Sequence, residues 1–151
     1  MTDDAPRWRL GDAADAGLRE VTRHEVEALC DAARAARLHC ARLDLAACRG
    51  KADLLTGFAR ELKFPTWFGH NWDALADCLD DLEWLRASGY LLVLENPVGL
   101  SNAAPKDFAV ALDILADAAR KWSERGTPFW VFIMAPARRA QDAKSEPAGG
   151  Q

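Results

Sequence analysis

The chain has 151 residues, half of them hydrophobic, and a formal net charge of -4. This length predicts one domain with a hydrophobic core. The acidic balance disfavours direct nucleic-acid binding, which depends on clustered Lys and Arg. No apolar run approaches the roughly 18 residues that span a bilayer, and Asp3 and Asp4 stand where a signal peptide would carry positive charge. A cytoplasmic location without membrane contact is therefore expected.

The cysteine pattern gives no sign of a metal or redox site. No two of the four cysteines form a CxxC pair of the kind found in zinc knuckles and thioredoxin-like proteins. A disulfide between Cys40 and Cys48 is conceivable from their spacing, but a cytosolic protein of this size does not need one. We expect reduced cysteines and no cofactor.

The first half of the chain predicts two helices and one or two strands. Residues 17–22 are a candidate edge strand, and residues 23–37 carry apolar side chains at helical spacing among good helix formers. Residues 38–45 are predicted to form a strand. Residues 53–63 place four apolar side chains on one helical face, and Pro65 must end that helix.

The second half alternates helices with strongly apolar strands. Asn71 is a good N-cap for a helix over residues 72–82, whose apolar residues recur every three or four positions. Residues 90–94 and 129–134 are short, almost continuous apolar runs, which is typical of strands covered on both faces. Between them, residues 106–125 predict a long amphipathic helix.

This order of elements predicts an α/β fold. A strand, a helix and a second strand in sequence imply a right-handed crossover and a parallel sheet. We expect a single small domain at residues 17–134, with three core strands and a candidate fourth strand at its N-terminus. Residues 1–16 are predicted to be partly disordered, and residues 135–151, which lack an apolar period, to be a disordered tail.

One stretch resists a purely structural explanation. Between Trp67 and Leu85 the chain has no Lys or Arg and five carboxylates, which are Asp73, Asp77, Asp80, Asp81 and Glu83. Like charges three or four residues apart each destabilise a helix by about 0.2–0.5 kcal/mol. The helix dipole can explain Asp73 in the first turn, but it does not extend to Asp77 and beyond. From charge alone, a solvated face and a binding surface fit equally well. The adjacent aromatic pair Trp67-Phe68 favours a binding surface.

The segment from Pro65 to Leu79, PTWFGHNWDALADCL, resembles the central signature of the barstar family, intracellular inhibitors of secreted microbial ribonucleases. The similarity extends from about Leu38 to Met134. It implies a barstar-like fold and a non-enzymatic, monomeric cytoplasmic inhibitor whose partner is a basic ribonuclease or related nuclease toxin. Such an inhibitor would act as an immunity protein.

The resemblance also implies which residues bind the partner. In the family, acidic side chains of this helix take the place of the substrate's phosphates, a role that falls on Asp73 and Asp77 here. The flanking contacts implied are Trp67, Phe68, Gly69, Asn71 and Asp80. Two positions depart from the family's inhibitor of known structure, which has a tryptophan at the position of Ala76 and an acidic residue at that of Lys121. These departures allow a partner of different shape.

Two other functions remain open from the sequence. His70, Asp73 and Asp77 could hold a divalent ion in a metal-dependent hydrolase. No other catalytic motif accompanies them, so a metal site is not expected. A general protein-interaction domain on the same fold is the third reading.

Overall fold

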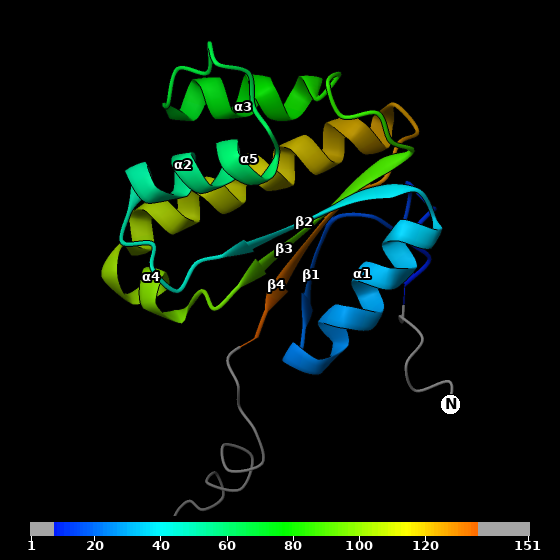
Figure 1. Ribbon diagram of the computed structural model, residues 1–151, viewed down its shortest axis with the longest axis horizontal. Coiled ribbons are helices and arrows are strands. Elements are labelled where there is room, and N and C mark those ends of the chain that lie inside the picture. The colour runs from blue at the N-terminus through cyan, green and yellow to red at the C-terminus, as the bar shows by residue number, and fades with distance from the viewer. Residues whose placement is uncertain (1–7, 136–151) are drawn as a thin grey trace, which may run out of the picture.

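A parallel sheet forms the centre of the computed structural model, which describes residues 8–135 (Figure 1). Its strands are β1 (Leu18–Val21), β2 (Leu38–Asp44), β3 (Gly89–Glu95) and β4 (Phe129–Met134). They lie in the order β1-β4-β3-β2, and every neighbouring pair is parallel. The α/β fold and the parallel sheet predicted from the sequence are confirmed, and the candidate N-terminal strand is the fourth strand.

The central position of β3 and β4 follows from their composition. Every residue of β3 except Glu95 is buried, as is every residue of β4 except Ile133. Alternate side chains point to opposite faces, so that Leu92 and Val131 belong to one core cluster while Val93 and Phe132 belong to the other. Strands of this kind are stable only between two covering layers.

Helices cover both faces of the sheet (Figure 1). They are α1 (Val26–Ala35), α2 (Lys51–Glu61), α3 (Trp72–Asp81), α4 (Val98–Ala103) and α5 (Pro105–Glu124). Helix α1 packs on the face formed by Val93 and Phe132, whereas α2, α3 and α5 contribute to the core on the opposite face. Helix α3 packs on α5 in the layer farthest from the sheet (Figure 1). It is therefore open to solvent along its outer side.

Local signals shift several element boundaries from those predicted. A 3-10 turn, η2 (Arg23–Glu25), precedes α1 because Thr22 and Glu25 form a capping box. Helix α2 ends before Pro65, since Lys63 adopts a left-handed backbone with φ of 55°. Helix α4 was not predicted, because its six residues are too few to show a helical period.

The predicted N-terminal segment falls partly within the described residues. Trp8 packs against Phe132 with ring centroids 4.8 Å apart, and the backbone carbonyl of Leu10 accepts a hydrogen bond from Trp130 Nε1 at 2.8 Å. Residues 8–16 therefore complete the core on the α1 face. Residues 1–7 and 136–151, which include nearly all of the predicted tail, lie outside the described residues.

Two further features bear on the sequence-based expectations. Within residues 8–135, no helix is both long and apolar enough to cross a membrane. All four cysteines are free thiols.

Partial burial of a histidine on β2 makes stability depend on pH. Burial lowers the pKa of His39 below its ordinary value of 6.5, and the nearby Lys63 ammonium lowers it further. The unfolded chain therefore binds a proton at a higher pH than the folded protein does, so the free energy of unfolding falls as pH drops below 6.5. We expect His39→Gln to lose less stability than the unaltered protein between about pH 7.5 and about pH 5.5. Urea unfolding at both pH values measures this, and identical losses in the two proteins would contradict it.

Candidate functional site

Helix α3 has one face fixed in the core and one face in solvent. Leu75, Cys78 and Leu79 are buried, at the three- and four-residue spacing that packs a helix on its neighbour. The indole Nε1 of Trp122, on α5, donates a hydrogen bond to the carbonyl of Leu79 at 2.7 Å. This contact ties α3 to α5 and fixes which side of the helix faces outward.

Asp73 and Asp77 lie on the outward side and are exposed. Neither carboxylate has an ion-pair partner in the part of the chain that the structure describes. The negative charge on this side of α3 also acts on the thiol of Cys78. The pKa of that thiol is raised by burial and then by the carboxylates of Asp77 and Asp81. The outer side of α3 is therefore a concentrated negative surface, and no side chain within residues 8–135 neutralises Asp73 or Asp77.

Asp80 differs from the other two aspartates. Its Oδ2 accepts from Lys121 Nζ at 3.2 Å, and its backbone carbonyl accepts from Arg125 Nη1 at 2.7 Å. Because α3 has no basic residue in its last turn, Lys121 on α5 and Arg125 just after it supply the positive charge that the C-terminal end of the α3 dipole favours. Asp80 is therefore held by side chains of its own protein, at the edge of the exposed acidic side of α3.

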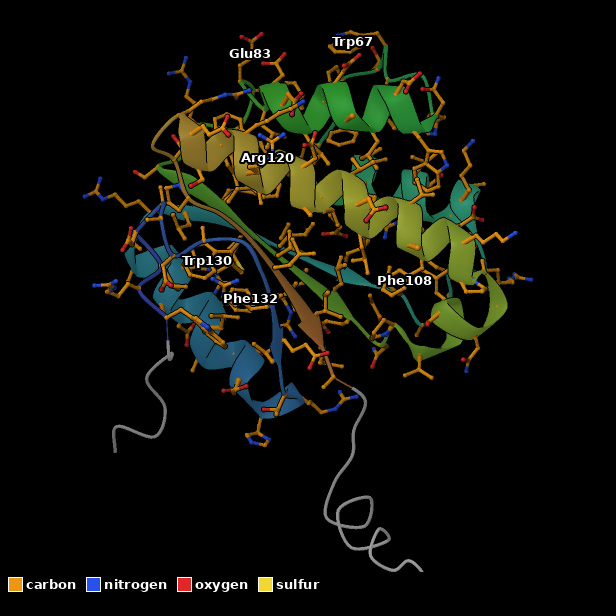
Figure 2. All side chains as sticks on the ribbon, turned by 180° about the vertical axis from the view of Figure 1, so that it is seen from behind. Trp67, Glu83, Phe108, Arg120, Trp130 and Phe132 are labelled. Atoms are coloured by element: carbon orange, nitrogen blue, oxygen red, sulfur yellow. The ribbon has the colours of Figure 1, made fainter. Side chains whose placement is uncertain are left out.

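The loop before α3 holds two adjacent aromatic rings in opposite directions. Phe68 is buried, with its ring 4.9 Å from that of Phe64, and the backbone N–H of Phe68 donates to the Pro65 carbonyl at 3.0 Å. Trp67 is 67% exposed. Figure 2 shows Trp67 and Glu83 on the side of α3 that faces away from the sheet. The burial of Phe68 therefore anchors the loop backbone while the Trp67 side chain extends into solvent.

Gly69 and Asn71 shape the entry into the helix. Asn71 Oδ1 accepts from the backbone N–H of Ala74 at 2.7 Å, which makes it the N-cap predicted from the sequence. Its Nδ2 donates to the Gly69 carbonyl at 3.3 Å. A Cβ at Gly69 would lie 3.3 Å from that nitrogen, which is a tight approach. Both residues hold the loop against the first turn of α3, next to Asp73.

Comparison with known families identifies the type of protein. Residues 38–134 match the family described as Barstar (barnase inhibitor). The chain belongs to the barstar family. The matched region runs from β2 to β4 and contains α3 and its preceding loop, while β1 and α1 precede it. At the level of the family, membership implies a protein of the ribonuclease-inhibitor type. The family consists of inhibitors and not of enzymes. No curated protein matches the chain.

The two departures from the family's pattern have different structural settings in this barstar-family chain. Ala76 lies on α3 between the exposed aspartates and is partly buried. Lys121 is held by Asp80 and by Asp117, whose Oδ2 lies 3.3 Å from Lys121 Nζ. Hydrogen bonding to Asp80 raises the pKa of Lys121, so its charge is kept and is balanced by acids of its own chain.

The geometry gives no support to a metal-dependent hydrolase in this barstar-family chain. Within residues 8–135, no three His, Cys, Asp or Glu side chains converge as a metal site requires. His70 packs its ring on Phe68, with centroids 4.7 Å apart, from a left-handed backbone position before the helix. Asp73 and Asp77 lie on the following helix, so the three residues are close in sequence without forming a coordination shell.

Sequence reasoning did not find the role of Lys121 and Arg125 at the end of α3. One signal was available, since a helix that ends in Asp80 and Asp81 without a basic residue needs a cation from elsewhere. Which residue supplies it depends on how α5 packs across α3, and no local pattern encodes that contact.

The N-cap allows a direct test of the local structure of the barstar-like loop. We expect Asn71→Ala to lower the free energy of unfolding by about 0.5–2 kcal/mol, because the N–H of Ala74 loses its acceptor. Asn71→Asp keeps an acceptor at the same position and serves as the control. Chemical unfolding of both variants measures the difference, and equal stability of Asn71→Ala and the unaltered protein would argue against the cap.

Proposed function

We propose that this protein binds and blocks the cationic active site of a ribonuclease, or of a related nuclease toxin, through the surface formed by Trp67, Asp73 and Asp77. We call the surface formed by this tryptophan and these two aspartates the acidic surface. A ribonuclease active site must hold the phosphates of RNA, so it gathers Lys and Arg side chains. Carboxylates on a rigid helix offer those cations charge-assisted hydrogen bonds that substitute for the substrate.

The observation that carries the proposal is the absence of internal partners for Asp73 and Asp77 among residues 8–135. Their mutual repulsion, and that with Asp80 and Asp81, destabilises the free helix. A partner that supplies positive charge removes that penalty on binding. Long-range attraction between the acidic surface and a basic enzyme also accelerates association.

The remaining predicted contacts have distinct roles in the proposal. Trp67 is an aromatic anchor for the rim of the nuclease site, since exposed tryptophans contribute strongly to interfaces. Phe68, Gly69 and Asn71 act by fixing the loop that presents it. Asp80 contacts the partner only at the edge, because Lys121 already holds its carboxylate.

Lys121 does not oppose binding to a basic enzyme on this proposal. Asp80 and Asp117 balance its charge, so its field at a distance is weak. An inhibitor that blocks one active site needs no second copy, no cofactor and no nucleic-acid contact. We therefore propose a monomer that acts in the cytoplasm on a basic protein partner.

The test combines capture with an activity assay. The immobilised full chain is mixed with a panel of basic microbial ribonucleases, barnase included, and with an extract of the cells that make the protein. We expect at least one ribonuclease to be retained and its hydrolysis of a fluorescent RNA to stop at equimolar inhibitor. Retention by an Asp73→Ala, Asp77→Ala variant at the same level would contradict the proposed surface, and recovery of no nuclease from either source would contradict the proposed function.

A further inference from the structure

Basic side chains gather at a second place, the edge of the sheet where β2 and β3 begin. An open pocket of about 600 Å³ lies there between the end of α1 and the segment that precedes β3. Its polar lining comes from Arg34, Arg37, His39, Arg86 and Ser88. The backbone N–H of Ser88 donates to the Arg37 carbonyl at 3.0 Å, which fastens the two walls together. We call this feature the basic pocket.

The positive charge of the basic pocket is only partly balanced by acidic side chains within residues 8–135. Arg34 Nη1 lies 3.2 Å from Asp31 Oδ1 in a well-exposed pair. Arg37 and Arg86 have no ion-pair or hydrogen-bond partner for their side chains within residues 8–135. The C-terminal end of the α1 dipole explains a cation at Arg34, but Arg86 comes from a separate segment. The guanidinium groups of Arg37 and Arg86 are exposed and have no partner within residues 8–135, so both are available to an external anion.

His39, at the start of β2, contributes to the lining of the basic pocket. Its Nε2 atom is closed off from solvent and has no hydrogen-bond partner within residues 8–135. An atom that solvent cannot reach does not contact a ligand in an open pocket, so His39 is a neighbouring reporter of binding and not a ligand-binding group.

We propose that the basic pocket binds a small molecule that carries two or more phosphate groups. Guanidinium forks match the oxygens of phosphate in a bidentate geometry. A ligand with several charges can engage Arg37 and Arg86 together, with Ser88 as an additional hydroxyl donor. The pocket volume lies within the range that holds small molecules, and Leu38 and Ala87 are the apolar residues of its lining. Recognition of the ligand therefore depends on its phosphate groups.

The test uses the full chain and calorimetric titration with inorganic tripolyphosphate, adenosine triphosphate and citrate. The variant is Arg37→Asn with Arg86→Gln, because Arg37 has φ of 67° and Asn tolerates that left-handed conformation. The control is Lys106→Gln with Arg120→Gln, which removes the same charge from α5. We expect tripolyphosphate to bind the unaltered protein and the control alike, and its affinity to fall about tenfold or more in the variant. Circular dichroism checks that the variant stays folded.

The outcomes separate the possible sources of the anion. Equal affinity for tripolyphosphate and adenosine triphosphate would show that the pocket recognises the phosphates alone. Tighter binding of adenosine triphosphate would show that the pocket also contacts the nucleoside. Both results support the proposal. A shift of the His39 imidazole resonances on titration with tripolyphosphate would place the ligand in the pocket. Equal binding of citrate, or equal loss of affinity in variant and control, would overturn it. The Asp73→Asn, Asp77→Asn variant should bind tripolyphosphate at least as well as the unaltered protein, so this result stands apart from nuclease inhibition.

Discussion

Replacing Asp77 by Asn is expected to weaken nuclease binding and, at the same time, to leave the protein as stable as before or slightly more stable. Removing one partner of a buried charge pair at an interface costs about 2–5 kcal/mol. This corresponds to a loss of affinity of about 30-fold to about 4,000-fold. Helix α3 itself loses the repulsion between Asp77 and Asp73, Asp80 and Asp81, each worth about 0.2–0.5 kcal/mol.

The opposite changes in binding affinity and in stability distinguish a binding role of Asp77 from a structural one. A structural aspartate would lose stability on substitution, and affinity would fall as a consequence. The measurement is the dissociation constant for a captured ribonuclease together with the free energy of urea unfolding. Glu20→Gln on β1, away from α3 (Figure 1), is the matched control and should change neither quantity. A higher dissociation constant together with a lower free energy of unfolding for Asp77→Asn alone would refute the proposed role.

Salt provides a second check on the same residue. Exposed charges that attract a partner over a distance are screened once ionic strength rises above about 0.1 M. The association rate of the unaltered protein should therefore fall with added salt, and that of the Asp73→Asn, Asp77→Asn variant should fall much less. Stopped-flow mixing with the ribonuclease measures both rates.

The core of the fold was predictable because its signals are local. The apolar runs in β3 and β4 are short and continuous, so their burial on both faces follows from composition alone. Asn71 was recognisable as an N-cap because the hydrogen bond it makes is to a residue three positions away. The order of strands and helices then left a parallel sheet as the expected topology.

The charge balance of the site could not be predicted in the same way. Asp80 and Lys121 are 41 residues apart, and only the packing of α5 on α3 brings them together. The opposite directions of Trp67 and Phe68 depend on the cluster of Phe64 and Phe68 beneath the loop. The basic pocket draws Arg37 and Arg86 from separate segments. Each of these features depends on tertiary contacts that no periodicity records.

Trp130→Ala is expected to have the largest effect on stability. The side chain of Trp130 is fully buried on β4, stacks on Phe132 with centroids 5.4 Å apart and donates to the Leu10 carbonyl at 2.8 Å. Replacing a buried large aromatic residue with alanine costs about 3–5 kcal/mol, and the Leu10 carbonyl also loses its donor. Because domains of this size are stable by only about 5–15 kcal/mol, a substantial part of the total would be lost.

The same substitution at Trp67 is the matched control. Trp67 is 67% exposed, and exposed residues away from special features change stability by only about 0.5 kcal/mol. We expect Trp67→Ala to unfold at nearly the same urea concentration as the unaltered protein while its affinity for the ribonuclease falls about 30-fold, the loss typical of an interface hot spot. Trp130→Ala should unfold at a much lower urea concentration. If Trp67→Ala lost as much stability as Trp130→Ala, the loop would be part of the core, and Trp67 could not be the anchor that the partner contacts.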